Sequence, residues 1–135
     1  FLYPGLDAPA TTVTTKLREV PLPGADDADL METAYLFVPP ACEDGADACA
    51  LHVVLHGCAQ SAESVGTEFI ELSGYLPWAE ANDIVLAFPQ VEKSMIAPMN
   101  PHGCWDWWGY TGDDYAWREG SQMAVVADWI RSLGK

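Results

Sequence analysis

Two short and almost uninterrupted apolar runs constrain the fold of this chain most strongly. Residues 50–55 and 84–88 consist mainly of Val, Ile, Leu, Ala and Phe. Runs of this length and composition are typical of strands that are covered on both faces of a sheet. Between them, Val65, Phe69 and Leu72 follow helical spacing, so strands and helices alternate along the chain. This order predicts an α/β fold in which a mostly parallel sheet is flanked by helices.

Prolines and glycines delimit the other expected elements. Residues 1–30 are rich in both, and we interpret them as a connector that can form a weak strand at 11–16. The remaining expected elements are a strand at 31–38, a helix that begins at Ser61 or Ser64 and ends at Gly74, a short helix at 77–82 and a final helix at 119–133.

Acidic residues dominate the charge of the chain. Six Lys and Arg residues oppose 20 Asp and Glu residues, which gives a formal net charge of −14. Such a surface repels phosphate backbones and anionic lipids, so we expect neither a nucleic acid nor a membrane as partner. No apolar run approaches the roughly 20 residues that a membrane-spanning helix needs. Because 50% of the residues are hydrophobic, we expect a folded chain rather than a disordered acidic tail.

Four cysteines in a small acidic chain favour an oxidising compartment and two disulfides. Four cysteines can pair in three ways. Cys42 and Cys49 flank one short polar loop and are the natural partners, which leaves Cys58 with Cys104. The second bridge would join the turn after residues 50–55 to a distant, tryptophan-rich loop.

The same region also contains the side chains of a candidate zinc site. Cys42, Cys49, His52, His56 and Cys58 are all potential ligands. His52 and His56 are four residues apart on a strand, so the strand rise separates them by roughly 13 Å. That separation is too large for one ion, and no Cys-x-x-Cys pair is present. We therefore expect disulfides and no metal.

The sharpest local signal for function is the turn His56-Gly57-Cys58 between a predicted strand and a predicted helix. In α/β-hydrolases, a His-Gly-x sequence after an early strand often donates a backbone N–H to the oxyanion hole. Gly57 permits an unusual backbone geometry, and the N–H of Cys58 or its neighbour would point at the oxyanion. The alternative is an ordinary structural turn that needs glycine, with His56 as a hydrogen-bonded histidine at the strand end.

A second candidate site is the loop at 100–110, called here the Trp loop, which contains Trp105, Trp107 and Trp108. Three tryptophans within four residues cannot all face one core. They either plug the core beneath the loop or form an apolar platform that grips an uncharged ligand. The residues alone favour neither interpretation.

The catalytic residues of a serine hydrolase are missing from the chain. It contains no Gly-x-Ser-x-Gly sequence, and no serine lies at a strand-to-helix elbow between glycines. His102 and Asp106 are close in sequence, but no activated nucleophile completes a triad. We therefore expect these 135 residues alone to lack a Ser-His-Asp triad.

Several segments occur in an order that resembles one known family. The segments are Thr33-Ala-Tyr-Leu-Phe-Val-Pro39, the Cys42/Cys49 pair, Leu51-His-Val-Val-Leu-His-Gly-Cys58-Ala-Gln-Ser61, residues 74–79, residues 84–90 and Asn100-Pro-His-Gly-Cys-Trp-Asp-Trp-Trp-Gly-Tyr110. Together they resemble the C-terminal portion of the catalytic domain of extracellular polyhydroxybutyrate depolymerases. The closest likeness is to the short-chain-length type with a circularly permuted α/β-hydrolase domain. The resemblance covers residues 31–133 and implies that residues 31–135 form a partial α/β-hydrolase fold.

The resemblance implies that the whole protein is a secreted serine esterase of poly(3-hydroxybutyrate)-type polyesters that needs no metal or organic cofactor. Its catalytic Ser, Asp and His would lie in the N-terminal part of the same enzyme, and its signal peptide would lie outside this chain. Cys58 would supply an oxyanion-hole N–H. Trp105 would line the substrate crevice, with Trp107 and Trp108 as neighbours.

Two other functions fit the same residues. A feruloyl or acetyl-xylan-type esterase of related sequence would use the same turn on other esters. Alternatively, the chain would act alone as a non-catalytic module that binds polyester or carbohydrate through the Trp loop. Product formation from polyester films and from aryl esters distinguishes the two enzymes, and granule binding without hydrolysis would favour the module.

Overall fold

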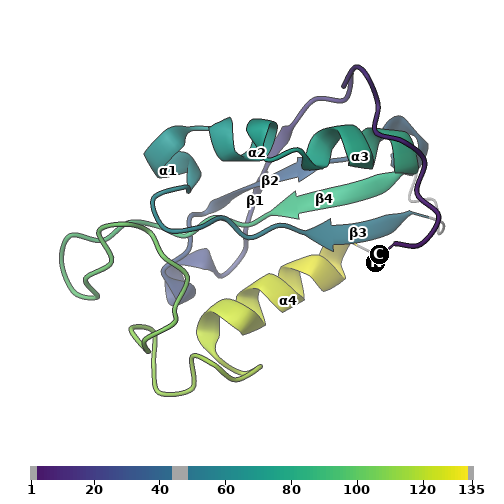
Figure 1. The fold of residues 1–135 in the computed structure, drawn as a ribbon. Helices are drawn as coiled ribbons and strands as arrows, with labels where there is room; N and C mark the ends of the chain where they lie inside the picture. The colour runs from purple at the N-terminus through teal and green to yellow at the C-terminus, as the bar shows by residue number, and fades with distance from the viewer. Residues whose placement is uncertain (1–2, 44–48, 134–135) are drawn as a thin grey trace.

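The computed structural model describes residues 3–43 and 49–133. One four-stranded sheet, in the order β1-β2-β4-β3, lies between two layers of helices (Figure 1). Helices α1, α2 and α3 cover one face, and α4 covers the other. The strands are β1 (Arg18–Pro21), β2 (Thr33–Phe37), β3 (Ala50–Val53) and β4 (Ile84–Phe88), and the helices are α1 (Ala62–Val65), α2 (Glu68–Leu72), α3 (Tyr75–Asn82) and α4 (Ser121–Leu133).

The sheet is mixed, and the expectation of a mostly parallel sheet is wrong. The apolar runs at 50–55 and 84–88 contain β3 and β4, which pair in parallel across the helical crossover α1–α3. The strand expected at 31–38 contains β2, but β2 runs antiparallel to β4, and β1 runs antiparallel to β2. An apolar run indicates that a strand is covered on both faces, but it gives no information about the direction of that strand.

The first 30 residues supply a strand and part of the core. Residues 11–16 form no strand, whereas β1 begins at Arg18. After β1, a short 3-10 helix, η1 (Ala25–Ala28), folds the chain back toward α4. Leu22 and Leu30 on either side of η1 are 2% and 0% exposed. Burial of such large apolar side chains stabilises the docking of this segment against the sheet.

Glycines divide the helical region differently from the expected pattern. The helix expected at 61–74 is two short helices, α1 and α2, with Gly66 between them at φ +60°. That backbone conformation leaves the right-handed helix, and glycine adopts it without steric cost. Helix α3 begins at Tyr75, directly after Gly74, rather than at Pro77. No helix among the described residues is long and apolar enough to cross a membrane.

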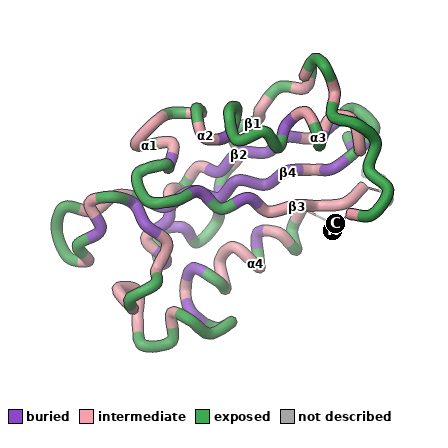
Figure 2. Tube along the Cα trace, viewed as in Figure 1, coloured by how far each residue is buried: buried purple, intermediate pink, exposed green. Residues whose placement is uncertain are grey.

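Two apolar clusters hold the layers together, one on each face of the sheet. Figure 2 shows the buried residues along β2 and β4. Successive side chains of a strand point to opposite faces. Ala34 and Leu36 of β2 therefore pack with Trp129 of α4. Tyr35 and Phe37, which alternate with them, pack with the side chains of α2 and α3. This double coverage fixes the central strands and, with them, the segment that leads from β3 into the His-Gly turn.

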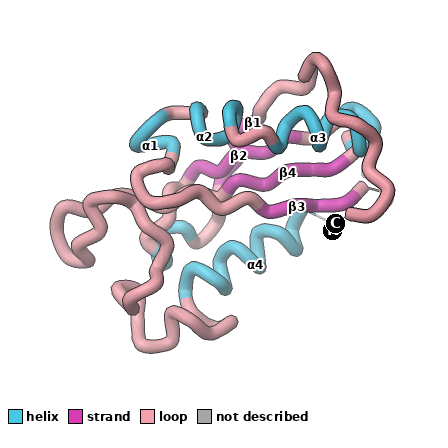
Figure 3. Tube along the Cα trace, in the orientation of Figure 1, coloured by secondary structure: helices cyan, strands magenta, loops and turns pink. Residues whose placement is uncertain are grey.

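The segment between β4 and α4 is long and irregular (Figure 3). It contains the Trp loop and a small excursion that is closed by a bridge between Ser94 and Asn100. Strand β3 lies at the edge of the sheet opposite β1. Among the described residues it pairs only with β4. The sheet thus has an open edge next to the turn at His56.

Candidate functional site

His56 lies after β3 and is only 3% exposed. The N–H of Val91 donates to His56 Nε2 at 3.1 Å, so the ring proton must be on Nδ1. Nδ1 then donates to the carbonyl of Gly57 at 2.8 Å. Burial lowers the pKa of His56, and the bond to Gly57 opposes that shift only in part. The ring is therefore neutral, and neither nitrogen is free for proton transfer.

The turn presents three consecutive backbone N–H groups. That of Gly57 donates to the side-chain oxygen of Gln60 at 2.9 Å. That of Ala59 donates to the carbonyl of His102 at 2.6 Å. The N–H of Cys58, between them, has no acceptor among the described residues, and Cys58 is exposed. Of these three groups, only the N–H of Cys58 is free among the described residues.

Gly57 leaves room for the Gln60 side chain and does not adopt an unusual φ. A Cβ at Gly57 would lie 2.7 Å from Oε1 of Gln60, the atom that closes the turn. The positive φ of the turn falls on Ala59, at +59°, a conformation that is uncommon for a residue with a side chain. Gly57 itself does not have a positive φ. The unusual geometry that the sequence predicts at Gly57 is therefore found two residues later, at Ala59.

Both expected disulfides are present. Cys42 pairs with Cys49, with a Cα–Cα distance of 5.9 Å, and Cys58 pairs with Cys104 at 4.3 Å. Cys104 is buried, whereas Cys58 is exposed at the turn. The second bridge thus fixes the Trp loop beside the free N–H.

The three tryptophans of the Trp loop occupy two environments. Trp105 is half-buried against the α4-side cluster, and its ring centroid lies 5.5 Å from that of His56. Its indole N–H is buried and has no acceptor among the described residues. Trp107 and Trp108 are 71% and 42% exposed, and their ring centroids are 5.3 Å apart. One tryptophan therefore faces inward toward the turn, and the other two form an outward-facing pair.

The carboxylate of Asp106 organises the backbone of the Trp loop. Its Oδ1 accepts the N–H groups of residues 108–110 at 3.1, 2.6 and 3.1 Å. Its Oδ2 accepts the N–H and the hydroxyl of Thr111 at 2.8 and 2.7 Å. Burial raises the pKa of Asp106, but these hydrogen bonds lower it by more, so the net shift is downward. Asp106 is charged and its acceptor capacity is used within the loop.

A polar network joins the Trp loop to α4. Oε1 of Gln122 accepts the N–H of Asp106 at 2.9 Å. Nε2 of Gln122 donates to the carbonyl of Ala28 at 3.1 Å and to the hydroxyl of Tyr110 at 2.8 Å. The Tyr110 hydroxyl in turn donates to the carbonyl of Cys104 at 2.8 Å. Burial raises the pKa of Tyr110 to about 12, so the hydroxyl keeps its proton.

Asn100 completes this network on the side of the disulfide. Its Nδ2 donates to the carbonyl of Cys104, and its Oδ1 accepts the N–H of the same residue, both at 2.9 Å. Sequence reasoning identified neither Asn100 nor Gln122 as a positioning residue. Gln122 meets Ala28 across 94 residues of sequence, so no local pattern could have revealed the contact.

A pocket of about 670 Å³ lies beside the turn. It is bounded by Gly57 and Gln60 and by two exposed leucines, Leu55 (53% exposed) and Leu72 (79% exposed). Phe69 and Leu72 lie on α2 at the expected helical spacing, and Leu72 is exposed. The other lining residues are Val65, Glu68, Phe69, Ser73 and Tyr75.

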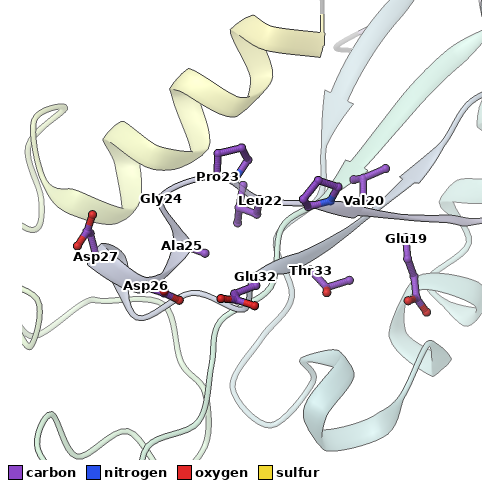
Figure 4. A pocket seen from close by; sticks show the side chains of 11 residues that line it. Glu19, Val20, Leu22, Pro23, Gly24, Ala25, Asp26, Asp27, Glu32 and Thr33 are labelled. Carbon is purple, nitrogen blue, oxygen red and sulfur yellow. The ribbon is translucent and has the colours of Figure 1, made fainter.

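A second large pocket, of about 620 Å³, lies away from the turn, between β1, η1 and the start of β2 (Figure 4). Its walls include Glu19, Asp26, Asp27 and Glu32. It contains none of the residues that the sequence singled out. Among residues 3–43 and 49–133, no group of three or more His, Cys, Asp or Glu side chains is arranged to hold a metal ion.

His52 is separated from the turn. Its Nδ1 lies 3.0 Å from the hydroxyl of Tyr3, and its ring lies 5.6 Å from that of Tyr75. These three side chains line a small apolar pocket of about 220 Å³ near α3. His52 and His56 therefore belong to different environments.

The sequence is similar to polyhydroxybutyrate depolymerases, although no family model matches the chain. Over 143 aligned residues it is 35% identical to a polyhydroxybutyrate depolymerase of Talaromyces funiculosus, covering 98% of this chain and 42% of that protein. Over 95 residues it is 41% identical to a poly(3-hydroxybutyrate) depolymerase of Delftia acidovorans, covering 70% of this chain and 18% of that protein.

Solved structures show the same similarity. A PHB depolymerase from Penicillium funiculosum matches with a TM-score of 0.89 and 35% identity, over 96% of this chain and 44% of that one. A substituted PHB depolymerase complexed with an R3HB trimer matches with a TM-score of 0.90 and 34% identity over the same shares. The chain spans less than half the length of these relatives. The chain is therefore a homologue of polyhydroxybutyrate depolymerases and corresponds to a part of their length.

Proposed function

We propose that the chain is part of a secreted serine esterase that hydrolyses poly(3-hydroxybutyrate)-type polyesters. In this proposal it supplies an oxyanion-hole turn and an aromatic substrate crevice. The catalytic Ser, His and Asp come from the N-terminal part of the same protein, in a circularly permuted α/β-hydrolase domain. Two facts support this division: the chain spans 42% of its fungal relative, and it contains no Gly-x-Ser-x-Gly sequence.

The observation that carries the proposal is the free N–H of Cys58. Both neighbouring N–H groups, of Gly57 and Ala59, are already used by Gln60 and His102. An unused backbone donor at a rigid turn is what an oxyanion hole requires, because it needs no reorganisation when negative charge develops. The disulfide to Cys104 and the buried ring of His56 hold this donor in place.

The chemistry follows that of other serine esterases. The serine passes its proton to the catalytic histidine of the N-terminal part and attacks the ester carbonyl, the oxygen of which becomes an oxyanion that accepts the Cys58 N–H. Collapse of the tetrahedral intermediate expels the alcohol, which takes that proton, and leaves an acyl-enzyme, which water hydrolyses. His56 cannot be the general base, since both its nitrogens are engaged and its pKa is lowered by burial.

The Trp loop provides a surface that suits a neutral polyester. Trp105 lies directly beside the turn, and Trp107 and Trp108 extend the aromatic surface outward. Ring faces and indole N–H groups bind alkyl and carbonyl groups without a need for charge. A similar protein has been solved with an R3HB trimer, which supports a polyester as the substrate of this one. The net charge of −14 does not oppose binding of an uncharged polymer.

The open edge of the sheet is where the rest of the enzyme docks. Strand β3 has an unpaired side among the described residues, and the pocket next to it exposes Leu55 and Leu72. An unpaired strand edge beside exposed apolar side chains is prone to aggregation unless another strand or helix covers it. Docking there would bring the missing nucleophile to the same side as the Cys58 N–H.

The two disulfides support secretion. Structural disulfides persist in oxidising compartments and are rare in the cytosol. All four cysteines of the chain are paired in this way.

The test compares Cys58→Pro with Cys58→Ala in the full-length protein. Both variants lose the disulfide, but only proline also removes the N–H. We expect Cys58→Pro to lower kcat for a soluble ester by a further ~10²–10³-fold, the usual effect of one oxyanion donor. Circular dichroism at matched temperatures checks that both variants are folded. Equal activity of the two folded variants would refute the oxyanion role.

A further inference from the structure

We propose that Asp106 is a positioning residue that sets the orientation of the Trp107–Trp108 pair and thereby the affinity for polyester. The inference rests on the proposed function, in which this pair contacts substrate. Asp106 itself contacts no substrate in this scheme, because its oxygens are occupied by the loop.

The bonding of Asp106 identifies it as the centre of the loop. Five donors converge on one carboxylate, and all of them belong to residues 108–111, which follow Trp107 directly. Hydrogen bonds to an ionised carboxylate are stronger than those between neutral groups. Residues 105–120 form no helix or strand, so these backbone donors lack the partners that regular structure would provide.

The carboxylate is fixed to the rigid part of the fold. The N–H of Asp106 donates to Gln122 of α4, which is 7% exposed and also binds Ala28 and Tyr110. The loop backbone is therefore attached to α4 on one side of Asp106 and folded around its carboxylate on the other.

The tryptophan pair, by contrast, has little support of its own. Trp107 is 71% exposed, and its ring packs against Trp108. Trp108 packs in turn against Tyr110, with ring centroids 4.7 Å apart. The direction of both indoles is thus set by the backbone at 107–110, and Asp106 holds residues 108–110 of this segment.

Asp106→Asn is the informative change. The amide keeps one acceptor oxygen but replaces the other with an NH₂ donor, which then faces the N–H groups of residues 108–110 or the N–H and hydroxyl of Thr111. Either arrangement places the NH₂ group against at least one backbone N–H and opens one side of the loop. Asp113→Asn is the matched control, because Asp113 lies in the same irregular segment, loses the same charge and is exposed.

The experiment uses the full-length protein and two independent readouts. The first is the excitonic couplet of the indole pair in the far-ultraviolet circular dichroism spectrum, which does not depend on enzymatic activity. The second is KM and kcat for a soluble hydroxybutyrate trimer, compared with kcat/KM for p-nitrophenyl acetate.

We expect Asp106→Asn to weaken the couplet and to raise KM for the trimer about tenfold, the effect of one lost charge-assisted hydrogen bond. Its kcat and its activity on p-nitrophenyl acetate should stay within about twofold of wild type, since the reacting atoms are untouched. Asp113→Asn should change neither readout. An unchanged couplet with an unchanged KM overturns the proposal, as does a parallel loss of activity on both substrates.

Thr111→Val covers the case in which Asp106→Asn does not fold. It removes one of the five donors and keeps the carboxylate, so we expect a smaller rise in KM, about two- to threefold. Wild-type KM and couplet for Thr111→Val would overturn the proposal. If the wild-type enzyme hydrolyses no ester, the proposed function fails, and the couplet alone still decides whether Asp106 positions the pair.

Discussion

The indole of Trp105 and the imidazole of His56 lie against each other, with ring centroids 5.5 Å apart and an interplanar angle of 41°. One ring belongs to the Trp loop and the other to the turn after β3, so their contact and the Cys58–Cys104 disulfide join the two candidate sites into one.

Replacing Trp105 should impair polymer hydrolysis more than hydrolysis of a small ester. In the full-length enzyme, we expect Trp105→Ala to lower the rate on polyester or on a trimer by about three- to tenfold, the value of one aromatic contact. A small aryl ester uses less of the crevice and should lose less. The measurement is kcat/KM on both substrates, and an equal loss on both would contradict a role for Trp105 in binding the polymer chain.

The two disulfides should contribute unequally to stability. Cys58 and Cys104 are 46 residues apart in sequence, whereas Cys42 and Cys49 are seven apart. In the chain-entropy model the long loop contributes about 3–4 kcal/mol to the free energy of unfolding and the short one about 2–3 kcal/mol. Urea unfolding of Cys104→Ala and Cys49→Ala tests the order. A larger loss for Cys49→Ala would show that native contacts outweigh loop closure.

Mild acid should destabilise the protein through His56. Burial lowers the folded-state pKa of His56 below its ordinary value of 6.5, so the unfolded state binds a proton more readily. The free energy of unfolding should therefore be insensitive to His56 above pH 6.5 and fall as the pH drops from 6.5 toward the folded-state pKa.

The measurement for this prediction is urea unfolding across that pH range. His56→Gln should remove the slope, while His102→Gln, at an exposed position, should keep it. A slope that survives in His56→Gln would assign the acid sensitivity to other groups.

The isolated chain should be inactive as an esterase. The 135 residues offer an oxyanion donor without a nucleophile, so neither hydroxybutyrate oligomers nor p-nitrophenyl esters should be hydrolysed above background. The full-length protein, assayed in parallel, should hydrolyse both. Esterase activity of the purified chain that disappears on mutation of one of its serines would overturn this division of labour. Polymer binding by a full-length protein without hydrolysis would instead favour the binding module.

Local pattern was sufficient for part of the fold and of the site. The apolar runs located β3 and β4, and the helix expected at 119–133 contains α4. Cysteine spacing alone selected both disulfide pairs. Each of these inferences depends on side-chain type and spacing along the chain, which are properties that folding does not change.

Other features depend on contacts between distant residues. The antiparallel direction of β2 and the position of β1 follow from strand pairing. An apolar run gives no information about that pairing. Likewise, no spacing rule distinguishes the N–H of Cys58 from those of its neighbours, because their acceptors come from a side chain in the turn and a carbonyl in the Trp loop.

The sequence by itself determined strands β2, β3 and β4, the final helix, the disulfides and the resemblance to polyester depolymerases, since all of these depend on residue type and order along the chain. Only the tertiary structure decided which N–H of the turn is free and which tryptophan faces inward. It also decided that Asp106 and Gln122 hold the Trp loop. The reason is physical: a hydrogen bond is made by whichever donor and acceptor the whole fold brings together, and the network of Gln122 spans 94 residues of chain.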